Sequence, residues 1–273
     1  MLRTAAIALA LTLPAAQAGA QSAAHAAVQT QAPAQGARDL LYRLDWGPVS
    51  LAEISACLVD PAPDADRAEG AEPASLTISA QSQGVASLLF DFSLSQHTER
   101  QGNGVRRFRS QGDFDGKPRN RLVIWDGSGA APEVDFFGDP PEDELTPVPA
   151  EALPRSVDPG TALLALMDQI AAGEGCEGSW KIYDGVRMMD LIVRDEGPDM
   201  IEADRDWTYA GPALRCRVGF NRVGGFRVDK PPKTDEADFD RLLWIADLEA
   251  GPTPVRLQVS WPLGYATARI VQE

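Results

Sequence analysis

The stretch VRRFRSQGDFDGKPRNRLVIWDG, residues 105–127, decides the fold, because it holds two β-rich runs on either side of an Asp-Gly dipeptide. The runs are Val105–Gly112 and Arg121–Trp125, and the dipeptide is Asp115-Gly116. Both residues of such a dipeptide tolerate the positive φ of a tight turn, so the pattern is a strong hairpin signal. The stretch therefore predicts two adjacent antiparallel strands.

The same pattern extends in both directions along the chain. Further turn dipeptides are Asn103-Gly104, Asp126-Gly127 and Asp184-Gly185. Further strands are predicted at Leu40–Trp46, Ser50–Val59, Ala74–Ser82, Ala86–Gln96, Trp180–Tyr183 and Val186–Val193. Near the end, Val255, Leu257 and Val259 alternate with polar residues, which is typical of a half-buried strand. A last strand, Leu263–Val271, is expected to return after Pro262.

One helix is predicted after Asp158, which can cap its first turn, with Pro159 at the first helical position. Its apolar residues recur at helical spacing and form one stripe, made of Leu163, Leu166, Met167 and Ile170. Such a stripe predicts packing against the sheet; a cofactor-binding stripe is the alternative. Gly173 is expected to end the helix.

Many short strands and one packed helix predict a mainly β fold, an antiparallel, strongly curved sheet or open barrel. The regularly alternating helices of a doubly wound α/β fold are missing from the pattern. We expect residues 38–273 to form a single domain.

The N-terminal segment has the features of a cleaved secretory signal. Arg3 precedes an apolar run, and the small-x-small patterns Ala16-Gln17-Ala18 and Ala18-Gly19-Ala20 follow it. Residues 1–20 are therefore predicted to be a signal peptide and residues 21–37 a disordered leader. The apolar run is short for a membrane span, so we expect a soluble mature protein in an oxidising compartment, the bacterial periplasm.

Composition limits the function classes. The chain has 25 Lys+Arg against 40 Asp+Glu, a formal charge of −15, which argues against nucleic-acid partners and anionic membrane surfaces. Its two histidines, His25 and His97, disfavour His-rich metal sites and Ser-His nucleophile systems. We expect no metal, no cofactor and no catalytic constellation.

Three cysteines, Cys57, Cys176 and Cys216, allow three single disulfides, and an oxidising compartment favours one of them. We favour Cys176–Cys216, which would staple the surroundings of the Asp184-Gly185 hairpin. Cys57 is then expected to be a small buried residue, with a reactive thiol as the alternative.

Acidic residues offer two weaker candidates. Asp113 and Asp115 have the spacing of a general acid and base on one strand face, but turn formation is the favoured interpretation. The run Glu142-Asp143-Glu144 has hard-cation ligands without the spacing of a calcium loop, so a solvated loop is expected. It lies in the Pro-rich loop Asp139–Pro159, and residues 61–73 form a second irregular insertion.

A locally basic stretch and the tryptophans complete the candidates. The stretch comprises Arg100, Arg106, Arg107, Arg109, Lys117, Arg119 and Arg121, and a solvent face paired with acids is favoured over an anion-binding surface. The six tryptophans are Trp46, Trp125, Trp180, Trp207, Trp244 and Trp261. They are expected to be core residues, and the lining of an apolar pocket is the alternative.

The order of several short motifs resembles the bacterial domain-of-unknown-function 3108 family (DUF3108). The motifs are Tyr42-Arg43-Leu44-x-Trp46-Gly47, Asp158-Pro159, Tyr183-Asp184-Gly185-x-Arg187 and Tyr209-x-Gly211-Pro212-x-x-x-x-Cys216. The resemblance spans about residues 38–272 and implies an exported envelope protein with a β-rich fold. It implies no reaction. The expected sheet and helix also resemble the architecture of periplasmic lipoprotein carriers.

These observations favour a non-catalytic periplasmic carrier or binding protein for an apolar or amphipathic ligand, such as a lipid. Two alternatives remain at this point. One is an envelope scaffold or assembly factor that binds another protein through a sheet edge or the acidic loops. The other is a hydrolase that uses carboxylates alone.

Overall fold

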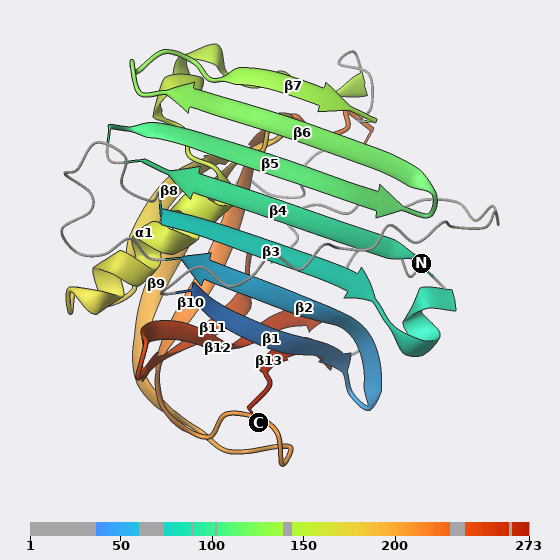
Figure 1. Cartoon of the computed structure of the whole chain (residues 1–273), viewed down its shortest axis with the longest axis vertical. Coiled ribbons are helices and arrows are strands. Elements are labelled where there is room, and N and C mark those ends of the chain that lie inside the picture. The colour runs from blue at the N-terminus through green and yellow to red at the C-terminus, as the bar shows by residue number, and fades with distance from the viewer. Residues whose placement is uncertain are drawn as a thin grey trace.

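The structure is a computed structural model that describes residues 37–59, 74–88, 90–101, 103–138, 144–229, 238–261 and 264–272. The expected signal peptide, and all of the expected leader except Ala37, lie outside these residues. The described residues form one antiparallel sheet of thirteen strands with one α-helix, which confirms the predicted fold class (Figure 1). Among them, no helix combines the length and apolar character needed to cross a membrane.

The strands of the first half are β1 (Ala37–Trp46), β2 (Val49–Val59), β3 (Ala74–Ser82), β4 (Phe92–Arg100), β5 (Val105–Phe114), β6 (Lys117–Asp126) and β7 (Glu133–Phe137). Those of the second half are β8 (Gly178–Tyr183), β9 (Met188–Ile201), β10 (Gly211–Gly224), β11 (Asp238–Leu248), β12 (Gly251–Trp261) and β13 (Gly264–Ile270). The helix is α1 (Pro159–Ala171), and two 3-10 helices lie at η2 (Gly84–Leu88) and η4 (Ala150–Arg155).

The first and last described strands lie side by side in the middle of the sheet. The strand order is β7-β6-β5-β4-β3-β2-β1-β13-β12-β11-β10-β9-β8, and β1 pairs with β13 from Tyr42–Ile270 to Trp46–Ala266. The chain therefore runs outward by hairpins to β7, crosses by way of α1 to the opposite end at β8, and returns by hairpins to β13. The sheet is strongly curved, so that its two halves face each other; we call strands β1–β7 and strands β8–β13 its two arms (Figure 1).

Side chains bring the two ends of the sheet together. The turn between β8 and β9 lies against β6 and β7, because a Cβ placed on Gly185 would be 2.9 Å from Val123 Cγ2 and 3.4 Å from Val134 Cγ1. Arg121 of β6 forms an ion pair with Asp184 of this turn, and their side chains are only 8% and 4% exposed. The outer edge of β8 is also occupied, by a parallel bridge between Val157 and Ile182. The sheet is thus a nearly closed barrel.

Helix α1 lies between the two arms and contacts β4, β8 and β12. Asp158 caps it as predicted, accepting hydrogen bonds from Thr161 N at 2.9 Å and from Thr98 Oγ1 at 2.6 Å. The helix approaches β4 so closely that a Cβ on Gly160 would lie 2.1 Å from Thr98 Oγ1. The sequence at this position therefore requires glycine.

The apolar alternation along the strands builds the core. On β3, Leu76, Ile78 and Ala80 are buried while Thr77 and Ser79 face outward. The turn of residues 105–127 also forms as predicted, because Asp115 and Gly116 have φ values of 53° and 73°. The predicted strand Ala86–Gln96 is wrong in its first half, where Phe90 N bonds Ala86 O and residues 84–88 form η2.

Candidate ligand pocket

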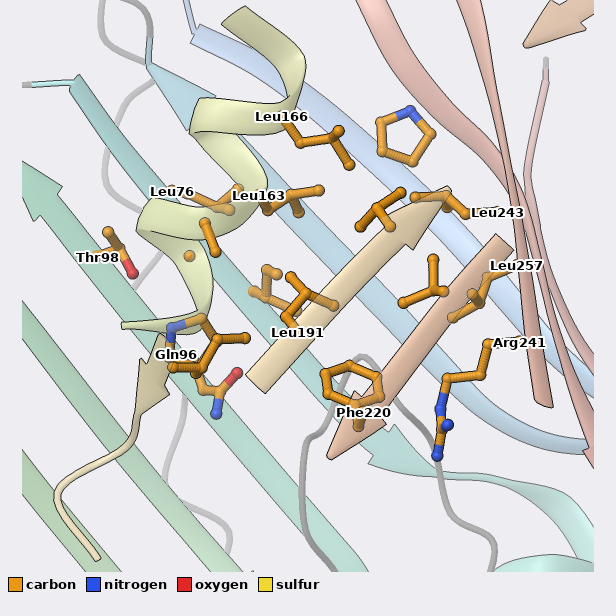
Figure 2. Close-up of a pocket in the computed structure, with 18 of the residues that line it drawn as sticks. Leu76, Gln96, Thr98, Leu163, Leu166, Leu191, Phe220, Arg241, Leu243 and Leu257 are labelled. Atoms are coloured by element: carbon orange, nitrogen blue, oxygen red, sulfur yellow. The ribbon is translucent and has the colours of Figure 1, made fainter. Parts of the chain in front are cut away.

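A cavity of about 110 Å³ lies between α1 and the concave face of the sheet (Figure 2). Its walls come from both arms: Leu76 of β3 on one side, and Leu191 of β9, Leu243 of β11 and Leu257 of β12 on the other. Leu163 and Leu166 of α1 cover it. Because successive residues of a strand point to opposite faces, each strand supplies only alternate residues to this wall.

A second cavity of about 50 Å³ adjoins the first. Leu163, Leu76 and Leu257 line both cavities, so Leu163 of the helix lies where the two meet. The second cavity extends toward Tyr42 of β1 and Ile54 of β2, in the middle of the sheet. Leu163 is therefore one of the side chains that lie between the two apolar spaces.

Three polar side chains line the first cavity: Gln96, Thr98 and Arg241. Thr98 is already occupied by its hydrogen bond to Asp158. Figure 2 shows Gln96 and Arg241 toward the end where Phe220 lies, with Leu166 at the opposite end. The cavity is therefore apolar along its length with a polar group on each side of one end.

Arg241 is held in a defined environment. It ion-pairs with Asp240 and its guanidinium lies 4.8 Å from the ring centroid of Phe220. Burial lowers the pKa of Arg241, while Asp240 and Asp238 oppose this shift. Burial raises the pKa of Asp240 in turn, against the pull of Arg241. Nε of Arg241 is buried and has no hydrogen-bond partner among the described residues.

The described cavities contain no acid pair. Neither cavity is lined by Asp or Glu, and no group of metal-ligating side chains was found in the described part of the chain. Chemistry that requires two carboxylates facing one substrate therefore has no support in these cavities.

The outer face of the sheet carries one cluster that sequence analysis missed. His97 Nδ1 lies 2.8 Å from Thr77 Oγ1, and His97 Nε2 lies 3.1 Å from Glu99 Oε1. A hydroxyl, an imidazole and a carboxylate in this order are the groups of a nucleophilic triad. However, Thr77 and His97 face each other across the β3–β4 ladder, on the face opposite the cavity-lining Leu76 and Gln96. The cluster pairs polar groups on the outer face of the sheet.

The predicted disulfide is present. Cys176, just before β8, is bonded to Cys216 of β10, and the two cysteines are 40 positions apart in sequence. Both residues are fully buried. Cys57 is half-buried and unbonded, and burial raises the pKa of its thiol, with Asp39 adding to the shift. An elevated thiol pKa is the opposite of what activates a nucleophilic cysteine.

The predicted acidic candidates form hydrogen bonds with backbone N–H groups or an ion pair. Asp113 accepts from Gly116 N at 2.7 Å within the β5–β6 turn, and Asp115 accepts from Asp91 N at 3.0 Å, which joins this turn to the residue before β4. Glu144 ion-pairs with Arg227. Glu142 and Asp143 lie outside the described residues.

The basic stretch is divided between the two faces of the sheet. Arg107 faces outward and pairs with Glu99 at 3.8 Å, as expected for a solvent face. Arg121 instead points inward to Asp184, and Arg106 donates to Ser156 O and lies over Trp125. The interpretation of the whole stretch as a solvent face was therefore wrong for these two residues.

The tryptophans do not line the cavities. Trp125 and Trp244 are buried core residues, and none of the tryptophans with a described side chain lines either cavity. The pocket residues that sequence analysis missed are Gln96 and Arg241. No alternation marks Arg241 as a residue that faces the cavity, because β11 has buried residues at consecutive positions from Leu243 to Ala246.

The chain matches no protein-family model and no curated protein. Among solved structures, it is similar to a β-barrel-like protein of domain of unknown function DUF1849 from Brucella abortus. The TM-score is 0.50 at 11% sequence identity, and the match covers 86% of this chain and 95% of that chain. At this identity the likeness concerns the fold alone. The resemblance to DUF3108 stays a prediction.

Proposed function

We propose that the protein is a non-catalytic periplasmic carrier or binding protein, and that an apolar or amphipathic ligand occupies the cavity beneath α1. The observation that carries the proposal is the cavity itself, which is apolar along its length and lies between a curved sheet and a covering helix. A cavity lined by aliphatic side chains stays dry and gains free energy when it takes up an apolar group.

The size of the cavity indicates how such a ligand binds. Its volume of about 110 Å³ is below the roughly 300–1,000 Å³ of drug-sized sites. It therefore suits a segment of a narrow chain better than a broad ring system. The adjoining 50 Å³ cavity beyond Leu163 provides the continuation for a longer chain.

A fluorescent apolar probe tests this proposal. Titration with methyl cis-parinarate, a fluorescent linear polyene without a charged headgroup, should give saturable binding at one site. Leu191→Phe fills the cavity wall and should weaken binding by about tenfold or more, because each excluded methylene-sized contact is worth about 0.8 kcal/mol. Leu122→Phe, on the outer face of β6, is the matched control and should bind as the parent does. Equal binding by both variants would contradict the proposal.

Export is the second part of the proposal and rests on residues 1–20. Cell fractionation followed by N-terminal sequencing should recover the chain from the periplasmic fraction, beginning after Ala18 or Ala20. Recovery of uncleaved protein from the cytosol would contradict it.

One observation favours the alternative scaffold function. Edge strand β7 pairs only with β6 among the described strands, and it exposes Phe136 and Phe137, which are 42% and 63% exposed. Exposed apolar residues on an edge strand are a site at which another protein can add a strand. In-cell crosslinking should then link the parent protein to a partner protein, and the Phe137→Lys variant should not be linked to it. The same crosslinked products from both proteins would contradict the scaffold function.

A further inference from the structure

The two polar groups at one end of the cavity have unused hydrogen-bonding capacity. Nε of Arg241 is buried without a partner among the described residues. The side chain of Gln96, on the opposite arm of the sheet, makes no hydrogen bond with any described residue. Figure 2 shows these two side chains toward the same end of the pocket.

A buried donor without an acceptor is costly, and native structures rarely keep one without a reason. Asp240 and the ring of Phe220 hold the Arg241 guanidinium in place. Nη1 also donates to Asp238 O at 3.3 Å. Nε of Arg241 is thus the buried donor at this end that has no acceptor among the described residues.

We propose that this end of the cavity binds the carboxylate of a fatty acid, with the acyl chain extending beneath α1 toward Leu163 and Leu166. This inference rests on the proposed function and specifies its ligand class. A carboxylate offers two acceptor oxygens in the plane that a guanidinium edge and an amide NH₂ can both approach. The aliphatic walls contact the chain.

The charges near this end also select the headgroup. Among the described residues, Arg241 is the one cationic side chain that lines this cavity, and Asp240 and Asp238 lie near it, so a cationic headgroup would meet the Arg241 guanidinium while an anionic one binds through Arg241 beside these two carboxylates. A neutral alcohol presents one acceptor oxygen in place of two. The net charge of −15 opposes non-specific anion binding, so an anion bound here depends on this local arrangement.

The test is displacement of methyl cis-parinarate by single-chain ligands below their micelle concentration. Dodecanoate should displace the probe at a concentration about tenfold lower than dodecanol does, the difference expected for a hydrogen bond to a charged group. Equal displacement by both ligands would overturn the carboxylate assignment. Stronger displacement by dodecyl phosphate than by dodecanoate would overturn it too, in favour of a phosphate headgroup.

Substitutions test whether Arg241 and Gln96 cause the preference for dodecanoate. Arg241→Met and Gln96→Leu should each weaken dodecanoate binding by about tenfold and leave dodecanol within about twofold, because only the charged headgroup uses these donors. The controls are Arg217→Met, whose guanidinium pairs with Glu196, and Gln258→Leu on β12. Neither Arg217 nor Gln258 lines the described cavities, so both controls should bind as the parent does.

The outcomes separate the two proposals. If the parent protein does not bind the probe at all, the proposed function fails and this inference fails with it. If the probe binds but neither variant changes the preference for dodecanoate, only this inference fails. Gln96→Leu nearly preserves side-chain volume, so it decides the question if Arg241→Met does not fold.

Discussion

At the scale of single residues, the Arg121–Asp184 ion pair holds two distant parts of the sheet together. The sequence around either residue does not indicate this role. The pair joins β6, near one end of the sheet, to the turn between β8 and β9 at the other end. Asp184 also accepts from Val186 N at 3.0 Å and Arg187 N at 2.7 Å, so one carboxylate shapes the turn and holds it against the opposite arm.

Removal of the Asp184 carboxylate should be strongly destabilising. Asp184→Ala leaves the Arg121 guanidinium buried without this counter-charge, and we expect a loss of about 3–5 kcal/mol in the free energy of unfolding. Asp190→Ala breaks the exposed Lys181–Asp190 pair on β8 and β9 and should cost less than about 1 kcal/mol. Urea denaturation measures both, and equal losses would contradict a structural role for the buried pair.

Asp199 gives a prediction about pH. The hydrogen bond from Trp244 Nε1 at 2.9 Å lowers the pKa of Asp199, with Met200 N and Arg215 adding to the shift. A carboxylate with a depressed pKa stabilises the fold above its unfolded pKa of 3.8, and the contribution is lost as pH falls through the lower folded value. Asp199→Asn does not titrate, so its stability should fall less than the parent's on acidification below about pH 5. Parallel pH curves of the urea midpoint would refute this.

At the scale of elements, the disulfide ties the loop before β8 to β10. A loop of 40 residues closed by a disulfide corresponds to about 4 kcal/mol in the chain-entropy account. The double substitution Cys176→Ser/Cys216→Ser should lower the free energy of unfolding by roughly 2–5 kcal/mol. Cys57→Ser is the control, since Cys57 is unbonded. A double variant as stable as the parent would show that the bridge does not constrain the chain.

Leu163 of α1 is one of the side chains between the two cavities, and this predicts a change in chain-length preference. Leu163→Ala should join the cavities and raise the affinity for hexadecanoate relative to octanoate, at a cost of about 2 kcal/mol in stability. Ile170→Ala lies on the same helix but lines neither cavity, so it should leave the preference unchanged. Competition binding with both acids measures the ratio. An unchanged ratio in Leu163→Ala would mean that this side chain does not limit the ligand.

The elements differ in how well their sequence predicts them. Asp158, Pro159 and the apolar stripe were sufficient for α1, because capping and helical spacing are local. β7 and β11 were missed; β7 has only five residues, and β11 has buried residues on consecutive positions in place of alternation. Polar and glycine positions interrupt β10, which obscured it as well. The strand predicted at residues 86–96 was wrong in its first half, because residues 84–88 form η2 with local backbone hydrogen bonds, and right in its second half, which lies in β4.

At the scale of the whole molecule, the pocket depends on topology more than on any motif. Gln96 lies on β4 and Arg241 on β11, far apart in sequence, and only the curvature of the sheet places them at one end of a cavity. Sequence analysis could predict a curved sheet and a covering helix. It could not predict which alternate residues face each other across the interior, because that requires the strand order.

The central claim is that the cavity beneath α1 holds an apolar chain, and a crystal structure with 12-bromododecanoate tests it most directly. We predict an anomalous bromine peak among Leu76, Leu163 and Leu166, with the carboxylate at Gln96 and Arg241. A fully occupied bromine site on the outer surface, with the cavity closed by its own side chains, would contradict the account.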